Sequence, residues 1–172
     1  MKYILKIKYI GTAYCGFQCQ KNGVAIQNVL TEAAERVFKC PCKVTGCSRT
    51  DSGVHALGFC ATVEPEKDIK IPAGKLHRAF ASVLPDDIAV VAAAEVGDDF
   101  HPRYSVTGKN YIYRIWDRPY SDPFEKGRSM RLTPSIDVNK NTIFFRKCIK
   151  YAFYKRITNL NSCRVKAIVL NE

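Results

Sequence analysis

The chain has 172 residues, 47% of them hydrophobic, which is enough for one sizeable domain with a real core, or for one domain and part of a second. Its formal net charge of +11 and its pI near 9.3 indicate a polyanionic partner, either nucleic acid or an acidic membrane surface. Residues 1–140 hold 20 Lys+Arg against 15 Asp+Glu, a net of +5, and residues 141–172 hold 7 against 1, a net of +6. The charge argument therefore depends heavily on the tail.

Membrane insertion and secretion are not indicated. The chain contains no run of 18 apolar residues, so a membrane-spanning helix is excluded on length. Residues 1–10 alternate lysines with Leu5, Ile7 and Tyr9, whereas a secretory signal peptide needs an unbroken apolar core. We therefore expect a cytoplasmic protein without a membrane partner.

Eight cysteines would indicate a metal site or disulfide bonds if their spacing matched a known scheme. The closest pairs are Cys15-x-x-x-Cys19 and Cys40-Pro-Cys42, and neither is half of a repeated Cys-x-x-Cys zinc motif. In a cytoplasmic protein the better interpretation is that the thiols stay reduced and act as small buried hydrophobes. We expect no metal site.

The pattern of apolar residues predicts the fold class. Residues 1–10 alternate in the manner of a half-buried strand, and Val24–Lys39 has the i, i+3, i+4, i+7 spacing of an amphipathic helix. Short apolar runs and proline boundaries predict strands over 43–47, 58–63, 88–94 and 105–116 and a helix over 73–83. The order strand, helix, strand, strand, helix, strand predicts an α+β fold with an antiparallel sheet, the split βαβ arrangement of ferredoxin-like proteins.

The last third of the chain is less regular. Residues 118–134 are rich in proline, glycine and charge and predict an irregular connection, while residues 141–152 have a helical apolar pattern and residues 164–170 predict a further strand. We divide the chain into a first domain, residues 1–104, and the start of a second half, residues 105–172.

The connection Gly11–Gln20 follows the first strand, and its glycines permit sharp bends. Its side chains Tyr14, Phe17, Gln18 and Gln20 have two interpretations. Either they face a base or a sugar, or the segment is a hairpin-like connection that packs its aromatic rings inward.

Residues 46–57 bring an arginine, a carboxylate and an imidazole together at Arg49, Asp51 and His55, separated by small residues that suit a tight loop. In one interpretation Arg49 pairs with Asp51, holds it ionised and fixes its direction, as a nucleophile or general base requires. In the other, Asp51 caps the turn through its backbone and Arg49 is a surface charge. The residues alone leave both interpretations open.

Five blocks of sequence stand in a fixed order: Gly11–Gln20, Ile26–Ala34, Ser48–Ala56, Phe100–Ser105 and Lys109–Ile115. In order and spacing they resemble the tRNA pseudouridine synthase A family. The stretch Arg-Thr-Asp-Ser-Gly-Val-His-Ala in the third block is the most specific part, and the resemblance covers about the first 135 residues.

This resemblance implies a pseudouridine synthase fold and an isomerase that acts on tRNA without a cofactor, usually as a homodimer. Such an enzyme breaks the N1–C1′ bond of a uridine at position 38, 39 or 40 in the anticodon stem–loop, turns the base and rejoins it through C5. Asp51 would be the catalytic carboxylate, Arg49 would pair with it and help to flip the base, and Tyr111 would stack on the uracil and assist proton removal. Tyr113 lies on the same face of a strand and is the rival candidate, or both tyrosines are cross-strand packing residues.

The resemblance also suggests residues that contact phosphate or sugar, because flipping a stem nucleotide costs roughly a few kcal/mol, which backbone contacts must offset. The candidates are His55, His101, Arg103 and Lys109, with Gln18 and Gln20 from the first connection. Each of them taken alone is equally a solvated surface residue.

Members of this family normally continue well past 172 residues, with a second ferredoxin-like half that completes the active-site cleft. After about Val138 the tail does not carry the motifs of that half, although residues 163–169 faintly resemble one of its strands, so we expect this half to be truncated or diverged. Two functions stay open: an active tRNA-uridine isomerase, and a catalytically impaired RNA-binding remnant of the family. A third, a structural or interaction role, requires the loop around Asp51 to be a plain turn.

Overall fold

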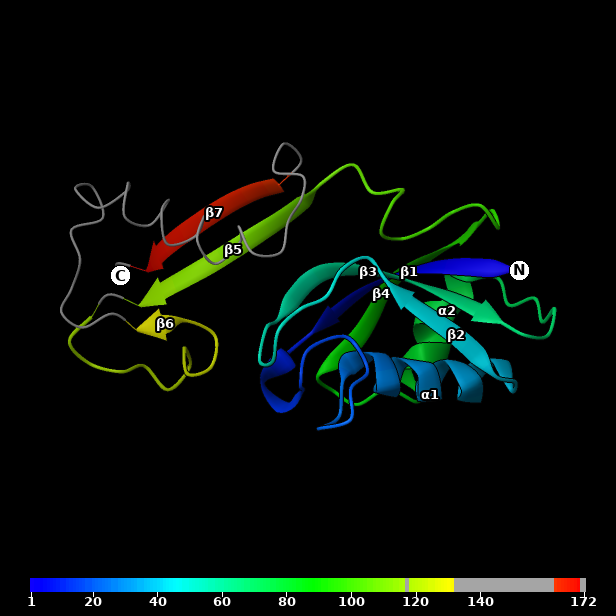
Figure 1. Cartoon of the computed structure of the whole chain (residues 1–172). Coiled ribbons are helices and arrows are strands. Elements are labelled where there is room, and N and C mark those ends of the chain that lie inside the picture. The colour runs from blue at the N-terminus through cyan, green and yellow to red at the C-terminus, as the bar shows by residue number, and fades with distance from the viewer. Residues whose placement is uncertain (117, 132–162, 171–172) are drawn as a thin grey trace. The chain divides into compact units, whose positions relative to one another are not determined.

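The computed structural model describes residues 1–116, 118–131 and 163–170, and the chain divides into two compact units, Met1–Val106 and Thr107–Glu172. The first unit contains, in chain order (Figure 1), β1 (Lys2–Tyr9), the single 3-10 turn η1 (Gly11–Ala13), α1 (Ile26–Phe38), β2 (Cys42–Gly46), β3 (Ala56–Pro65), α2 (Ala73–Ala81) and β4 (Ile88–Val96).

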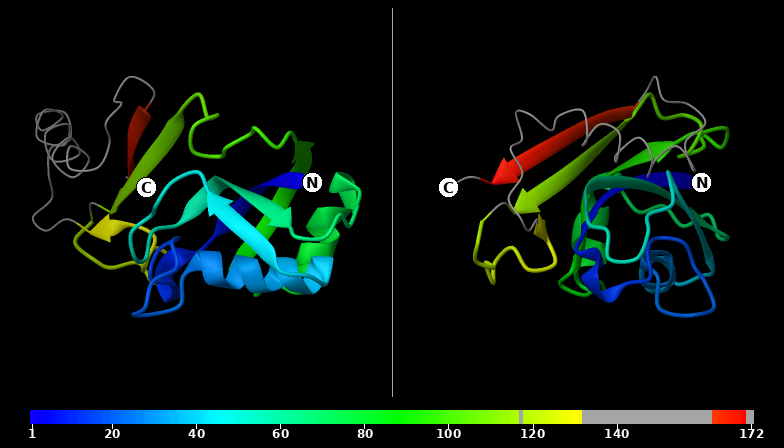
Figure 2. Two further views of the ribbon diagram at one scale, coloured as in Figure 1. Left: turned by 45° about the vertical axis from the view of Figure 1, so that its right-hand side comes forward. Right: turned by 60° about the vertical axis from the view of Figure 1, so that its left-hand side comes forward.

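The four strands of the first unit form one sheet in the order β2-β3-β1-β4, and each neighbouring pair is antiparallel. Helices α1 and α2 lie on one face of this sheet (Figure 2). Each helix connects two strands that are separated in the sheet by a third strand, which is the split βαβ arrangement. The predicted α+β fold with an antiparallel sheet is therefore confirmed.

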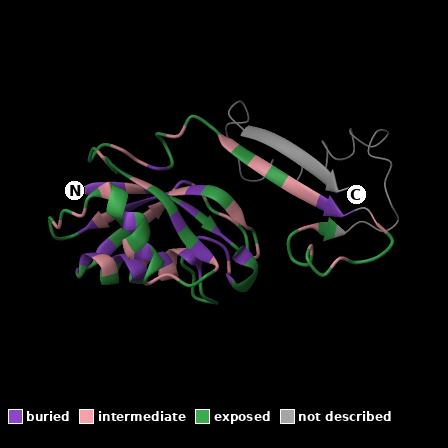
Figure 3. Ribbon diagram, turned by 180° about the vertical axis from the view of Figure 1, so that it is seen from behind, coloured by how far each residue is buried: buried purple, intermediate pink, exposed green. Residues whose placement is uncertain are grey.

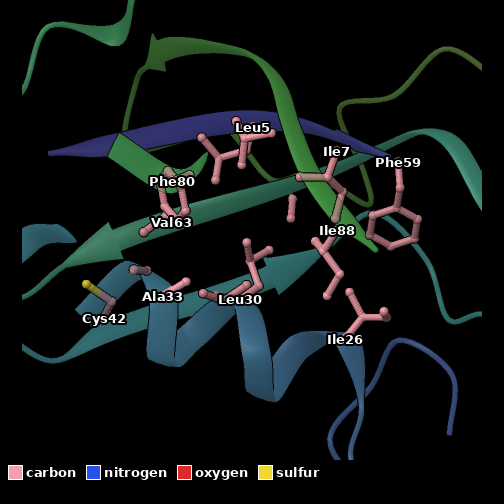
Figure 4. Close-up of a cluster of buried hydrophobic side chains, with 14 of the residues drawn as sticks. Leu5, Ile7, Ile26, Leu30, Ala33, Cys42, Phe59, Val63, Phe80 and Ile88 are labelled. Carbon is pink, nitrogen blue, oxygen red and sulfur yellow. The ribbon is translucent and has the colours of Figure 1, made fainter. Parts of the chain in front are cut away.

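The core lies between the sheet and the two helices. Alternate side chains of β1, Tyr3, Leu5 and Ile7, are fully buried there, while Lys6 and Lys8 between and beyond them are exposed. Figure 4 shows Leu5 and Ile7 beside apolar side chains of α1, α2 and β3, and Figure 3 shows buried residues alternating with exposed ones along the elements. Since burying one large apolar side chain stabilises a fold by about 1.5–3 kcal/mol, this strand alone contributes substantially.

Local backbone geometry accounts for two of the element boundaries that differ from the predicted ones. Helix α1 ends at Phe38 because Lys39 adopts a left-handed conformation, with φ of 51°. Strand β5 begins at Lys109 rather than at Ser105, because the amide of Ser105 donates to the carbonyl of His101 at 2.9 Å and closes a turn there. A backbone that closes a turn cannot pair in a ladder at the same residues.

The second unit has a smaller sheet of β5 (Lys109–Trp116), β6 (Met130–Arg131) and β7 (Cys163–Leu170), in the order β6-β5-β7. Both pairings of β5 are parallel, unlike those of the first unit. The strand predicted over residues 164–170 corresponds to β7, whereas the helical pattern over residues 141–152 lies outside the described residues.

Six cysteines lie in the described part of the first unit, and all are free thiols. Cys40, Cys42 and Cys47 are buried, as expected of small hydrophobes, whereas Cys19 is exposed and departs from that expectation. No helix among the described residues is long and apolar enough to cross a membrane.

Candidate active site

The residues between β2 and β3, 47–55, form a loop that we call the carboxylate loop because it carries Asp51. Its first residue still belongs to the ladder, since the Cys47 amide donates to the carbonyl of Cys60 at 2.9 Å. The chain then reverses in a turn, in which the Val54 amide donates to the carbonyl of Asp51 at 3.3 Å and Gly53 has a φ of +78°. Glycine suits this position because a side chain is strained at positive φ.

A second segment, residues 11–25, lies directly against the carboxylate loop, and we call it the first loop. The Phe17 amide donates to the carbonyl of Thr50 at 3.3 Å. In the other direction, the Gly53 amide and the Ser52 hydroxyl both donate to the carbonyl of Tyr14, each at 3.2 Å. Because both backbones supply partners, the two loops hold each other on either side of Asp51.

Two glycines make this close approach possible. A Cβ atom at Gly16 would overlap the carbonyl oxygen of Thr50, and one at Gly11 would overlap the carbonyl oxygen of Val54. Gly16 also has a φ of +84°, which disfavours any other residue. The glycines of the first loop therefore serve the placement of the carboxylate loop.

His55 and Tyr9 make hydrogen bonds that hold the carboxylate loop in place. The Nδ1 atom of His55 accepts the amide N–H of Gly11 at 3.0 Å, so the proton of the neutral imidazole is on Nε2. The hydroxyl of Tyr9 lies 3.2 Å from Oγ1 of Thr50, next to Asp51. Burial, partly offset by this hydrogen bond, raises the pKa of Tyr9 to about 12, so the phenol is neutral at physiological pH.

The aromatic side chains of the first loop point inward, which decides between the two interpretations of that segment. Phe17 is 2% exposed and stacks on Phe59, with ring centroids 4.3 Å apart. Tyr14 is 8% exposed and donates to Oδ1 of Asp87 at 2.7 Å. Burial and this carboxylate raise the pKa of Tyr14 to about 12. Neither ring is placed to face a base, so the inward-packing interpretation is confirmed for both.

The polar side chains of this region are more exposed than its buried aromatic rings. Arg49 and Asp51 are exposed, and so are Gln18 and Gln20 of the first loop, whereas His55 is half-buried. The side chain of Gln20 donates to the carbonyl of Cys15 within its own loop.

The ion pairs between described residues include Lys2 with Glu64 at 3.6 Å and Arg114 with Glu125 at 2.6 Å. The pairing of Arg49 with Asp51 stays a prediction. A carboxylate that is exposed at the tip of a well-held loop can reach a group on another molecule.

His101 and Arg103 lie in a turn that follows β4, at the end of the sheet opposite the carboxylate loop. The ammonium of Lys2 donates to the carbonyls of Asp98 and Phe100, at 2.8 and 3.1 Å, and Lys2 is at the opposite end of β1 from the carboxylate loop. His101 accepts the Arg103 amide at Nδ1, at 3.1 Å. This turn thus holds its own residues together without bringing them to Asp51.

Lys109, Tyr111 and Tyr113 lie on β5 in the second unit, at alternate positions and therefore on one face of the strand. All three are half-buried. Across the ladder, Tyr111 pairs with Val165 and Tyr113 with Ala167. The choice of Tyr111 over Tyr113 as the stacking residue stays a prediction.

Sequence reasoning missed the residues that position the site, namely Tyr9, Thr50 and Asp87. Their contacts join positions 41 and 73 residues apart, and no local pattern marks such pairs. Across the described part of the chain, no group of three or more His, Cys, Asp or Glu side chains could hold a metal ion.

The fold and the site together define an α+β protein with an exposed carboxylate on a rigidly held loop, in a strongly basic chain. That combination suits chemistry on a nucleic acid. A family model described as tRNA pseudouridine synthase matches residues 6–105, and the chain belongs to this family.

Proteins named tRNA pseudouridine synthase A are similar to the chain over most of its length. That of Aquifex aeolicus (strain VF5) is 35% identical over 170 residues, which is 99% of this chain and 70% of the relative. That of Thermoanaerobacter sp. (strain X514) is 47% identical over 137 residues, 80% of this chain. That of Ruminiclostridium cellulolyticum is 42% identical over the same length. The matched part is only 55% of each of the last two relatives.

Proposed function

We propose that this chain is a tRNA pseudouridine synthase that isomerises uridine in the anticodon stem–loop, at position 38, 39 or 40. The observation that supports this most is the placement of Asp51: an exposed carboxylate at a turn held by hydrogen bonds from the first loop. It lies within residues 6–105, the part that matches the family. The site of action is the cytoplasm, and the assembly is a homodimer.

The reaction needs no oxidant or reductant, because atoms and electrons balance within the substrate. The N1–C1′ bond of the nucleotide breaks, a C5–C1′ bond forms, C5 loses its proton and N1 gains one. Asp51 either forms a covalent adduct with the sugar or base, or stabilises positive charge at C1′. Both routes require an ionised carboxylate that the flipped nucleotide can reach.

Other residues have supporting roles in this proposal. Arg49 pairs with Asp51, fixes its direction and helps to flip the base. Tyr111 stacks on the uracil and assists loss of the C5 proton, since a phenol offers both a flat face and a hydroxyl. His55, whose Nδ1 accepts the Gly11 amide, is one of the residues that contact a phosphate or sugar oxygen of the substrate.

Binding of the tRNA is driven largely by charge. Gln18, Gln20, His101, Arg103 and Lys109 supply further contacts to the backbone. Because each neutralised phosphate releases counterions, the affinity falls steeply as salt concentration rises. The net charge of +11 makes this dependence measurable.

The test compares the whole chain with Asp51→Asn, which removes the charge and keeps the shape. Anticodon stem–loop RNA with tritium at C5 of uridine releases tritium when pseudouridine forms. We expect the variant to lose activity at least about a hundredfold and to bind the RNA as tightly as the parent chain. Asp68→Asn, which alters another exposed aspartate of the same unit, is the matched control and should keep full activity.

Two results would contradict the proposal. Equal tritium release from the chain and from Asp51→Asn would remove the carboxylate from the mechanism. No release from either, with salt-sensitive RNA binding intact, would instead indicate an RNA-binding remnant of the family.

A further inference from the structure

Cys47 and Cys60 face each other across the β2–β3 ladder, at the base of the carboxylate loop. Gly46 pairs with Ala61 in this ladder, so the next two residues stand directly opposite, and the Cys47 amide donates to the Cys60 carbonyl at 2.9 Å. Directly opposite residues project their side chains to the same face of a sheet. Opposite residues in a hydrogen-bonded pair have Cα atoms about 5.5 Å apart, inside the range of roughly 4.4–6.8 Å in which disulfides form. Their Cβ atoms, about 5.5 Å apart, must approach to about 4.5 Å for the bond to close.

The surroundings of the two thiols support their proximity. Burial raises the pKa of the Cys60 thiol, and Cys47 raises it further, whereas the neighbouring Lys6 lowers it. Cys47 is 8% exposed and Cys60 is half-buried. Cys60 is therefore the thiol that a dissolved oxidant reaches first, and Cys47 is placed to react with it afterwards.

The other described cysteines of the first unit contact residues outside this pair. Cys15 packs against Gly23, and Cys19 accepts a hydrogen bond from the side chain of Asn28 at 3.1 Å. Cys42 donates to the carbonyl of Cys40 at 3.4 Å, toward the other end of β2. Within the part of the chain that the structure describes, no other two cysteines stand directly opposite in a ladder.

We propose that Cys47 and Cys60 form a reversible cross-strand disulfide when the chain meets a small-molecule disulfide such as oxidised glutathione. Cys60, as thiolate, attacks the oxidant and releases one small thiol, leaving a mixed disulfide. Cys47, as thiolate, then attacks the Cys60 sulfur and releases the second. In sum, two protein thiols are oxidised to one disulfide, and one small disulfide is reduced to two thiols that carry away both protons.

This bond would close a ring around the whole carboxylate loop, with Asp51 inside it. The two ends of the loop would then be covalently fixed, so that β2 and β3 could not separate at the site. Amide exchange in residues 48–59 should therefore slow on oxidation, because local opening of the loop is restricted. The proposal does not depend on the activity of the chain.

Peptide mapping tests it, because trypsin cleaves between the two cysteines. The full chain is reduced, freed of reductant, incubated with oxidised glutathione, quenched, alkylated and digested without reductant. Cleavage after Lys43, Arg49 and Lys67 yields fragments 44–49 and 50–67. We expect the two fragments to appear joined, lighter than their sum by two hydrogen atoms, and to separate after treatment with dithiothreitol.

Variants sharpen this result. Cys47→Ser should leave Cys60 carrying glutathione with no joined fragments, while Cys42→Ser, at the other end of β2, should leave the joined fragments unchanged. Glutathione retained on Cys60 of the parent chain, both fragments recovered only as alkylated thiols, or either fragment joined to a different cysteine would overturn the proposal. If Cys47→Ser does not fold, the map of the parent chain decides alone.

Discussion

Two histidines of the first unit each accept a backbone N–H at Nδ1, but their donors lie at very different distances along the chain. His55 accepts from Gly11 at 3.0 Å, 44 positions away, and His101 accepts from Arg103 at 3.1 Å, two positions away. The first bond joins the carboxylate loop to another segment. The second only closes a turn.

The contrast extends to the neighbours of each histidine. Around the carboxylate loop, Tyr9 from β1 reaches Thr50, and Tyr14 of the first loop is itself held by Asp87 at the start of β4. Around His101, the partners are Arg103, Tyr104 and Ser105. The carboxylate loop is thus held by contacts from several segments, whereas the contacts of the His101 side chain come from residues of its own turn.

Gly16→Ala should have the largest effect, because the new Cβ meets the Thr50 carbonyl at a φ of +84°. Strain and overlap together should cost about 3 kcal/mol of unfolding free energy, measured by denaturant titration. Gly53→Ala has positive φ but nothing near its Cβ, so it should lose only about 1–2 kcal/mol. Gly74→Ala in α2 has neither defect and should gain about 0.5–1 kcal/mol. Equal losses in all three would show that the close approach of the loops contributes nothing.

His55→Leu comes next, because it leaves the Gly11 amide without its acceptor. A half-buried N–H that loses its partner costs about 1–2 kcal/mol, which the same titration can resolve. His55→Asn should recover part of the loss, since its Oδ1 can take the place of Nδ1 as acceptor. If Leu and Asn were equally destabilising, the bond to Gly11 would not be the contribution that His55 makes.

The architecture of the first unit could be predicted from sequence because it follows from periodicity. The alternation in β1 and the apolar stripe of α1 specify which faces are buried, and the order of elements then specifies the split βαβ sheet. The start of β5 was misplaced for a local reason: the turn that His101 and Ser105 close competes with a strand that the β-forming residues favour.

The candidate site was only partly predictable. The cluster of Arg49, Asp51 and His55 is visible as a run of reactive side chains in one loop, but what holds it is not. Aromatic residues in a connection, such as Phe17, serve equally well as a core contact or as a stacking surface, and only the folded chain decides between these roles. Hydrogen bonds such as that of Tyr14 with Asp87 leave no trace in local sequence.

Tyr9→Phe should cost about 1 kcal/mol at neutral pH, through the lost hydrogen bond with Thr50. It should also change the response to alkali. The pKa of Tyr9 rises from 10.0 to about 12 on folding, so its contribution is complete below pH 10 and is lost as pH rises toward 12. This contribution of Tyr9 to the free energy of unfolding amounts to about 3 kcal/mol. The variant should therefore lose stability less steeply than the parent chain over that window, although Tyr14, with a similar pKa, retains its own contribution. Parallel curves for the two proteins would contradict this account.

His101→Leu should have the smallest effect on stability, within about 0.5 kcal/mol, because it breaks only contacts within its own turn, the bond to Arg103 and the ring contact with Tyr104. A loss equal to that of His55→Leu would show that this turn is anchored as firmly as the carboxylate loop, and the contrast between the two histidines would fail.

The same variant also tests whether His101 binds RNA. If stability is unchanged but RNA binding weakens, while His101→Asn restores the local bond without restoring binding, then the imidazole itself contacts the RNA. Unchanged binding in both variants would leave the turn with a structural role only, and phosphate contacts would then have to come from other basic residues.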